Sequence, residues 1–181
     1  MVSIIYFFWL LVALFTLIGA MRGWAKELLV TFSMVLALFL ITLIENYVEI
    51  FKVLMTNTDE TSIKNVFWIR SVIVMTLAFF GYQTTAILER FVGSKLSRDK
   101  LQDLLLGAFI GFFNGVLIVG TLLFYVHQGN YPFPEFISRP PDEMMASVEQ
   151  LVSFLPPRWL GIPGIYVAVG LAFLFVLIVF I

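Results

Sequence analysis

Residues 107–126 read GAFIGFFNGVLIVGTLLFYV, a run without a charged residue that is long enough to cross the hydrocarbon core of a bilayer as a helix. Gly107, Gly111 and Gly115 recur in it at every fourth residue, so they share one face of such a helix. Small residues at this spacing let two helix backbones approach closely in lipid, where hydrophobicity alone gives little drive for helix association. The stretch therefore predicts a membrane-spanning helix that packs tightly against another helix.

The composition of the whole chain is also that of a membrane protein. Hydrophobic residues make up 61% of the 181 residues, charged residues make up 13%, and the mean hydropathy is +1.00. Soluble domains carry about 25% charged residues. The net charge of −1 is spread over short loops, which leaves no basic face for nucleic acid, and the absence of cysteine excludes disulfides and thiolate metal sites. We predict an all-α integral membrane protein.

Hydropathy along the chain predicts five membrane-spanning helices, over residues 2–20, 28–44, 66–87, 107–126 and 162–181. The break between the first two is so short that we expect an antiparallel hairpin. An interfacial helix should follow near residues 45–54, and a polar loop over 56–65. We divide the chain into a four-helix membrane region (1–127), a proline-rich loop (128–160) and a last span (161–181). In that span Gly164, Ala168 and Ala172 repeat the small-residue spacing, which predicts a second close helix contact.

The proline-rich loop contains a predicted amphipathic helix at about residues 142–155. Its apolar side chains fall on one stripe, made of Met144, Met145, Val148, Leu151, Val152 and Leu155. This helix could rest on the membrane surface, cap its own bundle or dock a partner protein, and the sequence leaves these alternatives open. Other integral membrane subunits and lipid are the partners that such a stripe and the small-residue faces favour.

The distribution of lysine and arginine predicts how the chain is inserted. Six basic residues lie on the side reached after the first and third spans, in two short loops, at positions 22, 26, 90, 95, 98 and 100, against five on the other side. Short cytoplasmic loops carry the excess of positive charge. We therefore expect a multi-pass protein of the bacterial cytoplasmic membrane with its N-terminus and proline-rich loop outside and its C-terminus in the cytoplasm.

Two stretches resemble a known family. Residues 19–29 read GAMRGWAKELL and residues 103–115 read DLLLGAFIGFFNG. They resemble the Gly-x-x-Arg-Gly-x-x-x-Glu signature and the glycine-rich second block of the colicin V production protein family. The resemblance implies a multi-spanning inner-membrane protein linked to colicin V export or production and to envelope physiology, without established catalytic residues. It also implies that the family's motif positions are occupied by Arg22, Gly23, Glu27, Asp103, Gly107, Gly111 and Gly115.

Physical chemistry gives these motif residues a structural interpretation as well. Gly23 permits a backbone angle that other residues resist, so Arg22 and Glu27 are expected to flank a tight turn and to form a charge pair at the membrane interface. Asp103 lies at the start of a predicted helix, where a carboxylate is favourable, and Arg22 or Lys26 could be its partner.

The chain offers little that could support catalysis. Its single histidine, His127, has no companion at metal-ligand spacing, and we expect an interfacial histidine, with one ligand position for a haem or chlorin held by a neighbouring subunit as the minor alternative. We therefore predict no catalytic residues, no metal site and no cofactor. Arg70 lies near the end of its predicted span and is expected to extend outward to the interface. Asn114 is expected to make an interhelical hydrogen bond or, as the second choice, to line a pore.

Three functions remain open at the level of sequence. The favoured one is a non-catalytic scaffold or accessory subunit that packs into a larger membrane complex through the small-residue faces of its helices and through its amphipathic helix. A component of a membrane transport or secretion pathway is the alternative, and it would require a polar-lined route through or into the bundle. An enzyme is the least favoured, because no nucleophile, base and metal constellation is present.

Overall fold

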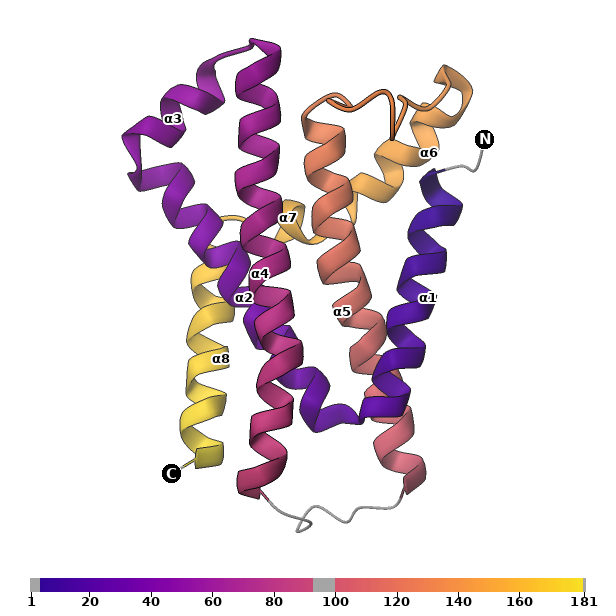
Figure 1. The fold of residues 1–181 in the computed structure, drawn as a ribbon, viewed down its shortest axis with the longest axis vertical. Coiled ribbons are helices and arrows are strands. Elements are labelled where there is room, and N and C mark those ends of the chain that lie inside the picture. Colours follow the sequence, from indigo (N-terminus) through magenta and orange to yellow (C-terminus); the bar gives the residue numbers. More distant parts are fainter. Residues whose placement is uncertain (1–3, 93–99, 181) are drawn as a thin grey trace.

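The computed structural model describes residues 4–92 and 100–180, and every element within them is a helix. The helices are α1 (Ile4–Arg22), α2 (Trp24–Tyr47), α3 (Glu49–Thr56), α4 (Glu60–Val92), α5 (Lys100–Gln128), α6 (Asp142–Ser153), α7 (Pro156–Trp159) and α8 (Gly164–Phe180). Figure 1 shows the long helices side by side, with the turn between α1 and α2 toward one end and α3 and α6 toward the other. We call these the turn end and the loop end. The all-α membrane fold is confirmed.

Four of the helices are long and apolar enough to cross a membrane, namely α1, α2, α4 and α5. Helix α8 is a shorter apolar helix of 17 residues, at the lower limit of the roughly 17–25 residues of a membrane-spanning helix. The fifth span therefore stays a prediction. Residues 156–163 form α7 and a turn containing Gly161 and Pro163, so that α8 begins at Gly164. In Figure 1 it starts partway along the bundle and runs back toward the turn end.

Helices α1 and α2 do not form the predicted hairpin. They are separated by Gly23 alone, with φ of +87°, and they diverge from this turn as a V (Figure 1). Helix α1 lies along α5 instead, because the glycines of α5 let the two backbones meet. The hairpin prediction is wrong because helices that follow one another in the chain need not pack together, and here the small-residue face of α5 determines where α1 packs.

Helix α4 begins earlier than the sequence pattern predicts. The carboxylate of Asp59 accepts the backbone N–H of Ser62 at 2.9 Å, which satisfies one of the unpaired donors of the first turn. This hydrogen bond lowers the pKa of Asp59. The helix consequently starts at Glu60, within the predicted polar loop of residues 56–65, and the loop that remains is correspondingly short.

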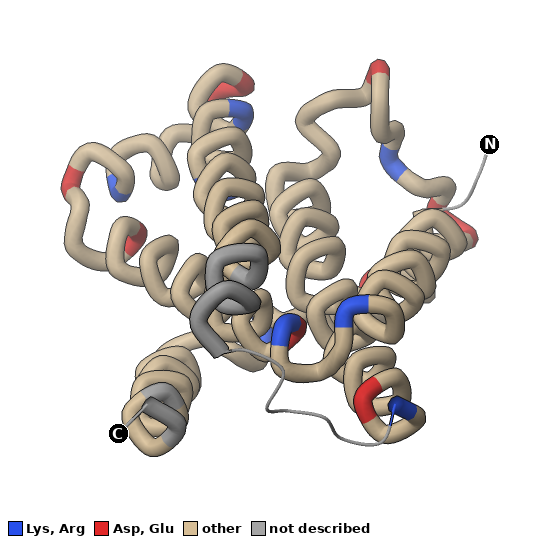
Figure 2. Tube along the Cα trace, turned by 60° about the horizontal axis from the view of Figure 1, so that its bottom comes forward, with Lys and Arg blue, Asp and Glu red and all other residues tan. Residues whose placement is uncertain are grey.

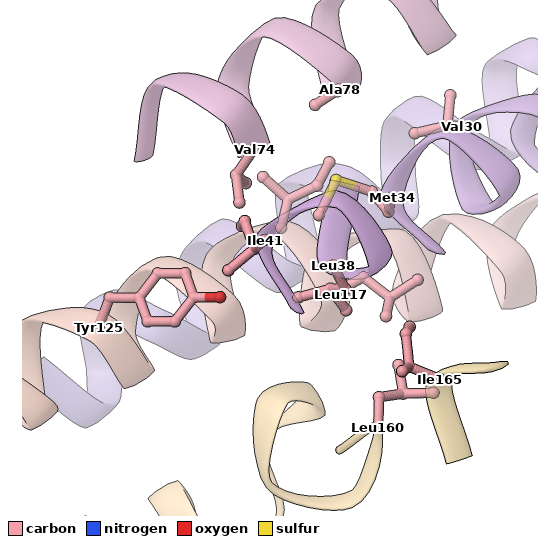
Figure 3. Packing of buried hydrophobic residues seen from close by; sticks show 11 residues of the cluster. Val30, Met34, Leu38, Ile41, Val74, Ala78, Leu117, Tyr125, Leu160 and Ile165 are labelled. Atoms are coloured by element: carbon pink, nitrogen blue, oxygen red, sulfur yellow. The ribbon is translucent and has the colours of Figure 1, made fainter. Parts of the chain in front are cut away.

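The apolar core has two parts. The larger cluster joins α2 to α4, α5 and the α7–α8 region, and Figure 3 shows Met34 and Leu38 of α2 between Val74 of α4 and Leu117 of α5. The smaller cluster lies toward the loop end and joins α6 to α1 and α5 through Phe8, Val12, Leu123, Val148, Val152 and Leu155. Together they hold all four candidate spans in one bundle.

Charged residues lie mainly toward the two ends of the bundle, and the helical stretches between them are almost free of charge (Figure 2). Arg22 and Lys26 flank the turn between α1 and α2, where Arg22 pairs with Glu27, and Lys100 begins α5, whose Asp103 lies against the same turn. Lys95 and Arg98, which the orientation prediction also used, lie outside the described residues. The distribution leaves an apolar band between two polar ends, as a bilayer requires.

Candidate functional site

Two buried ion pairs distinguish this bundle from a purely apolar one. Arg22 pairs with Glu27 at the turn end, and Arg70 pairs with Glu45 at the loop end. Ionisable residues within membrane helices are rare, almost always face the protein interior, and mark candidate functional sites. Both pairs are therefore candidate sites in this chain.

Arg70 of α4 is only 5% exposed, so the expectation that it extends outward to the interface is wrong. Its Nε and Nη2 lie 2.8 and 2.7 Å from the same carboxylate oxygen, Oε1 of Glu45 in α2, and its Nη1 donates to Oε1 of Gln128 in α5 at 2.8 Å. The guanidinium also lies 4.8 Å from the centre of the Tyr125 ring. Three helices thus meet at one arginine.

Two clefts open beside Arg70. One is about 240 Å³ and is otherwise mostly apolar, and the other is about 300 Å³ and includes Glu45, Thr42 and Asn46. Both are lined by Met55, Arg70, Tyr125 and Gln128. Arg70 therefore belongs to the wall shared by the two clefts. The Glu45 side chain is 25% exposed, so the acid of this pair is the partner that reaches the cleft surface.

Glu27 of α2 is completely buried at the turn end. Its Oε1 lies 3.3 Å from Nε of Arg22, and its Oε2 accepts a hydrogen bond from the side-chain amide of Asn114 at 2.8 Å. The same amide donates to the backbone carbonyl of Glu27 at 2.9 Å, and Asn114 accepts from Thr31 at 2.8 Å. Asn114 therefore makes interhelical hydrogen bonds between α5 and α2, and Glu27 is a core residue instead of an interfacial one.

Arg22 is held from a second side by α4. Its Nη2 donates to the backbone carbonyl of Tyr82 at 3.3 Å, and its guanidinium lies 4.3 Å from the centre of the Tyr82 ring. The Arg22 side chain is 22% exposed, so this pair reaches solvent through its base. Helices α1, α2, α4 and α5 all contribute to the turn-end site.

The glycine face of α5 packs inside the chain. A Cβ on Gly111 would lie 2.6 Å from the carbonyl oxygen of Phe15 and 2.8 Å from the Cα of Gly19, and Gly107 contacts the backbone of Gly19 equally closely. A Cβ on Gly115 would lie 3.1 Å from the Cα of Val12. The face that the sequence offered for packing is thus covered by α1 of the same molecule.

Asp103 lies against the turn between α1 and α2. Its Oδ1 accepts the backbone N–H of Trp24 at 3.2 Å, and a Cβ on Gly23 would lie 2.6 Å from its Oδ2. Two features therefore require glycine at position 23, namely the positive φ and the close approach of the Asp103 carboxylate. The sequence placed Asp103 at the start of its own helix, and the structure adds that it caps the start of α2.

The apolar stripe of the amphipathic helix is largely covered by the bundle. Val148, Val152 and Leu155 are buried against α1 and α5, and Leu151 packs against the same cluster, while Met144 and Met145 are partly buried. This corrects the docking interpretation for the buried residues, because a side chain packed within its own molecule offers no surface to a partner. Of the three alternatives that the sequence left open, the structure has the helix capping its own bundle.

The small residues of α8 do not form a second glycine-type contact. Among the described residues, only the carbonyl oxygen of Trp159 lies within 4 Å of a Cβ on Gly164, and Ala172 is partly buried. Ala168 packs against the larger core cluster, and α8 meets α2 through ring pairs such as Phe32 with Phe175. A close approach that the sequence pattern missed lies between α2 and α4, where a Cβ on Gly81 would be 3.0 Å from the Cα of Val30.

His127 is engaged in a local contact. Its Nδ1 lies 3.1 Å from the hydroxyl of Tyr131, a buried residue with φ of 58° in the turn after α5. Within residues 4–92 and 100–180, no group of three histidine, cysteine or acidic side chains is placed to hold a metal ion. Burial raises the pKa of Tyr131, so its hydroxyl stays protonated beside the imidazole.

Sequence reasoning found the turn-end pair through its motif but missed the loop-end pair. The available signal was the presence of Glu45 and Arg70 near the ends of two neighbouring spans, because opposite charges at similar depth in adjacent helices favour pairing.

Comparison with known proteins gives one family. The profile described as colicin V production protein matches residues 5–139, which include α1 to α5 and the start of the proline-rich loop, and leaves α6, α7 and α8 outside the match. No curated protein and no solved structure gives a significant match. Since the profile covers well over half of the chain, this multi-pass membrane protein belongs to the colicin V production protein family.

Proposed function

We propose that this protein is a non-enzymatic component of a membrane transport or secretion pathway, and that its Arg70 site binds an anionic solute or an anionic group of a larger cargo. The observation that carries the proposal is a buried arginine in the wall shared by two clefts. A guanidinium stays charged at any physiological pH, and its planar fork of donors suits carboxylate and phosphate groups. The description of the family points to the same class of function.

The proposed binding step is an exchange of anions on Arg70. Glu45 holds Arg70 through a single oxygen, Oε1, and its side chain is partly exposed at the larger cleft. An incoming anion can take the place of this carboxylate while Gln128 keeps its hydrogen bond to Nη1. The desolvated cleft strengthens such an interaction relative to the same pair in water.

We place this site on the outer side of a bacterial cytoplasmic membrane, with the N-terminus outside and the C-terminus in the cytoplasm. The support is the positive-inside rule applied to Arg22 and Lys26, beside the turn between α1 and α2, and to Lys100 at the start of α5.

The second candidate is an accessory subunit of a larger membrane complex. Its support is the outward face of α4, where Trp68, Met75 and Phe79 are each more than half exposed. Lipid would cover these side chains equally well, whereas the glycine face and most of the amphipathic stripe are already used within the molecule.

One experiment separates the two candidates. The full chain is purified in mild detergent and placed in liposomes, and both solute uptake and charge movement are recorded on adding small carboxylates, phosphates or sulfates, with amines for comparison. We expect anion-dependent signals that Arg70→Gln abolishes and Arg139→Gln preserves, because Arg139 is exposed and 3.9 Å from its nearest acid. A folded wild-type protein that is silent toward every anion contradicts the transport proposal. Silence together with a stable co-migrating membrane protein supports the accessory subunit.

A further inference from the structure

We propose that Glu27 is a proton-binding site, taking up and releasing a proton from the turn end of the bundle. The inference rests on the proposed function only where it gives the proton a role, as the ion coupled to transport. The binding of the proton itself is argued from the geometry at Glu27 and is tested without transport.

The two oxygens of Glu27 have different surroundings. Oε2 accepts the Asn114 amide, while Oε1 accepts no hydrogen bond from the described residues although it is fully buried and 3.3 Å from Arg22. Buried polar atoms are nearly always hydrogen-bonded, and each exception calls for an explanation. Because Oε2 already accepts the Asn114 amide, Oε1 is the oxygen on which a proton leaves that hydrogen bond intact, and it does so beside Arg22 and Tyr82.

The neighbours of Glu27 tolerate both of its charge states. When Glu27 is neutral, Asn114 can still donate to Oε2 and to the Glu27 backbone carbonyl. Arg22 keeps its contacts with the backbone carbonyl and the ring of Tyr82. The released arginine is also partly exposed, so water can solvate it. Protonation at this site thus leaves no buried charge without a partner.

Three helices around Glu27 each contribute a group whose charge or dipole affects proton binding at Glu27. Helix α1 contributes Arg22, α4 contributes Tyr82, and α5 contributes the neutral Asn114. At the same end, Asp103 accepts the backbone N–H of Trp24, and Lys26 lies in the first turn of α2. Arg22 is the cation paired with the carboxylate, and its partial exposure gives the proton a path to solvent at the turn end.

The test is infrared difference spectroscopy of the full chain in detergent between mildly acidic and mildly alkaline buffer. We expect a C=O stretching band of a protonated, buried carboxylic acid that disappears in Glu27→Gln and remains in Glu149→Gln, which removes an exposed acid on α6. No such band in the wild-type protein, or a band unchanged in Glu27→Gln, overturns the proposal.

Should Glu27→Gln fail to fold, Arg22→Gln decides. Removal of the neighbouring cation favours the neutral acid, so the band must appear at higher pH than in the wild-type protein, and an unshifted band overturns the proposal. If the band behaves as expected and the liposomes stay silent, Glu27 binds a proton and the transport function is wrong. If anion signals appear in the liposomes and the band does not, the transport function is supported and Glu27 does not bind a proton.

Discussion

At the turn end the buried partner of the ion pair is the acid Glu27, whereas at the loop end it is the base Arg70. The side chains of Arg22 and Glu27 are 22% and 0% exposed, and those of Arg70 and Glu45 are 6% and 25% exposed. The same two chemical groups are thus arranged in opposite senses at the two ends. Such inversion has consequences because the groups respond differently to burial.

A buried carboxylate can lose its charge by binding a proton, but a buried guanidinium cannot lose its charge in a protein. The turn-end ion pair can therefore be broken by protonation of Glu27. The loop-end ion pair can be broken only when another anion replaces Glu45 on Arg70. This difference is the reason for assigning a proton to one site and an anionic ligand to the other.

The largest effect is expected from Gly111→Leu, which should dismantle the turn-end site. Gly111 packs against the backbone of Phe15 and Gly19 in α1, and a leucine there must push α1 away from α5. Most of the protein should then be lost from the monodisperse fraction in size-exclusion chromatography.

Gly170→Leu is the matched control for this change. Gly170 lies in α8, and a Cβ on it would meet no atom of the described part of the chain within 4 Å, so the same substitution should leave yield and elution unchanged. Equal behaviour of the two variants would mean that the contact between α1 and α5 does not hold the bundle together.

The next largest effect is expected from replacing the acid of each ion pair, which tests whether the buried partner is the acid at the turn end and the base at the loop end. Glu45→Gln leaves Arg70 buried and charged without a counter-charge, which should lower the free energy of unfolding by about 3–5 kcal/mol. Glu27→Gln leaves Arg22 its contacts with Tyr82 and with water and keeps an acceptor for Asn114, so the loss should be about 1 kcal/mol. Thermal unfolding in one detergent compares the two. A larger loss for Glu27→Gln would reverse the assignment.

The two sites also differ in how far the sequence could predict them. Hydropathy located the four long spans, and the motif brought Arg22 and Glu27 together, because both depend on residues close in the chain. Arg70 was misplaced because the Asp59 cap starts α4 at Glu60, which puts Arg70 about three turns inside the helix. Its pairing with Glu45 and Gln128 depends on which helices pack together, and that follows from backbone contacts such as those of Gly19 and Gly81.

The burial of the amphipathic stripe could not be predicted for the same reason. A stripe of apolar residues shows that one face is covered, but the pattern is the same whether lipid, another protein or the same chain covers it. Val148 packs in one cluster with Phe8 and Leu123, and these two residues come from distant parts of the sequence.

A smaller, local effect is expected from Val148→Asp, which should disturb the loop-end site alone. Val148 is fully buried against α1 and α5, and an unpaired carboxylate there should release α6. Helix α7 follows directly, and its Pro157 and the adjoining Leu160 line the larger cleft, so anion binding at Arg70 should weaken while the Glu27 band persists.

Hydrogen exchange measures the release of α6, and Ser147→Asp, on an exposed position of the same helix, should leave it protected. Rapid exchange of α6 in the wild-type protein would show that the helix is not held by the bundle.

The smallest perturbation tests on which side of the membrane each ion pair lies. The chain has no cysteine, so single cysteines at the exposed positions Ser147, near the loop end, and Gln102, at the turn end, report without background and should cost no stability. An impermeant thiol reagent added to intact cells should label Ser147→Cys and spare Gln102→Cys until the membrane is opened, because the basic turn end is expected to face the cytoplasm. The opposite labelling would place Arg70 inside and Glu27 outside. The anion site would then meet cytoplasmic solutes, and the proton on Glu27 would enter from the outer side.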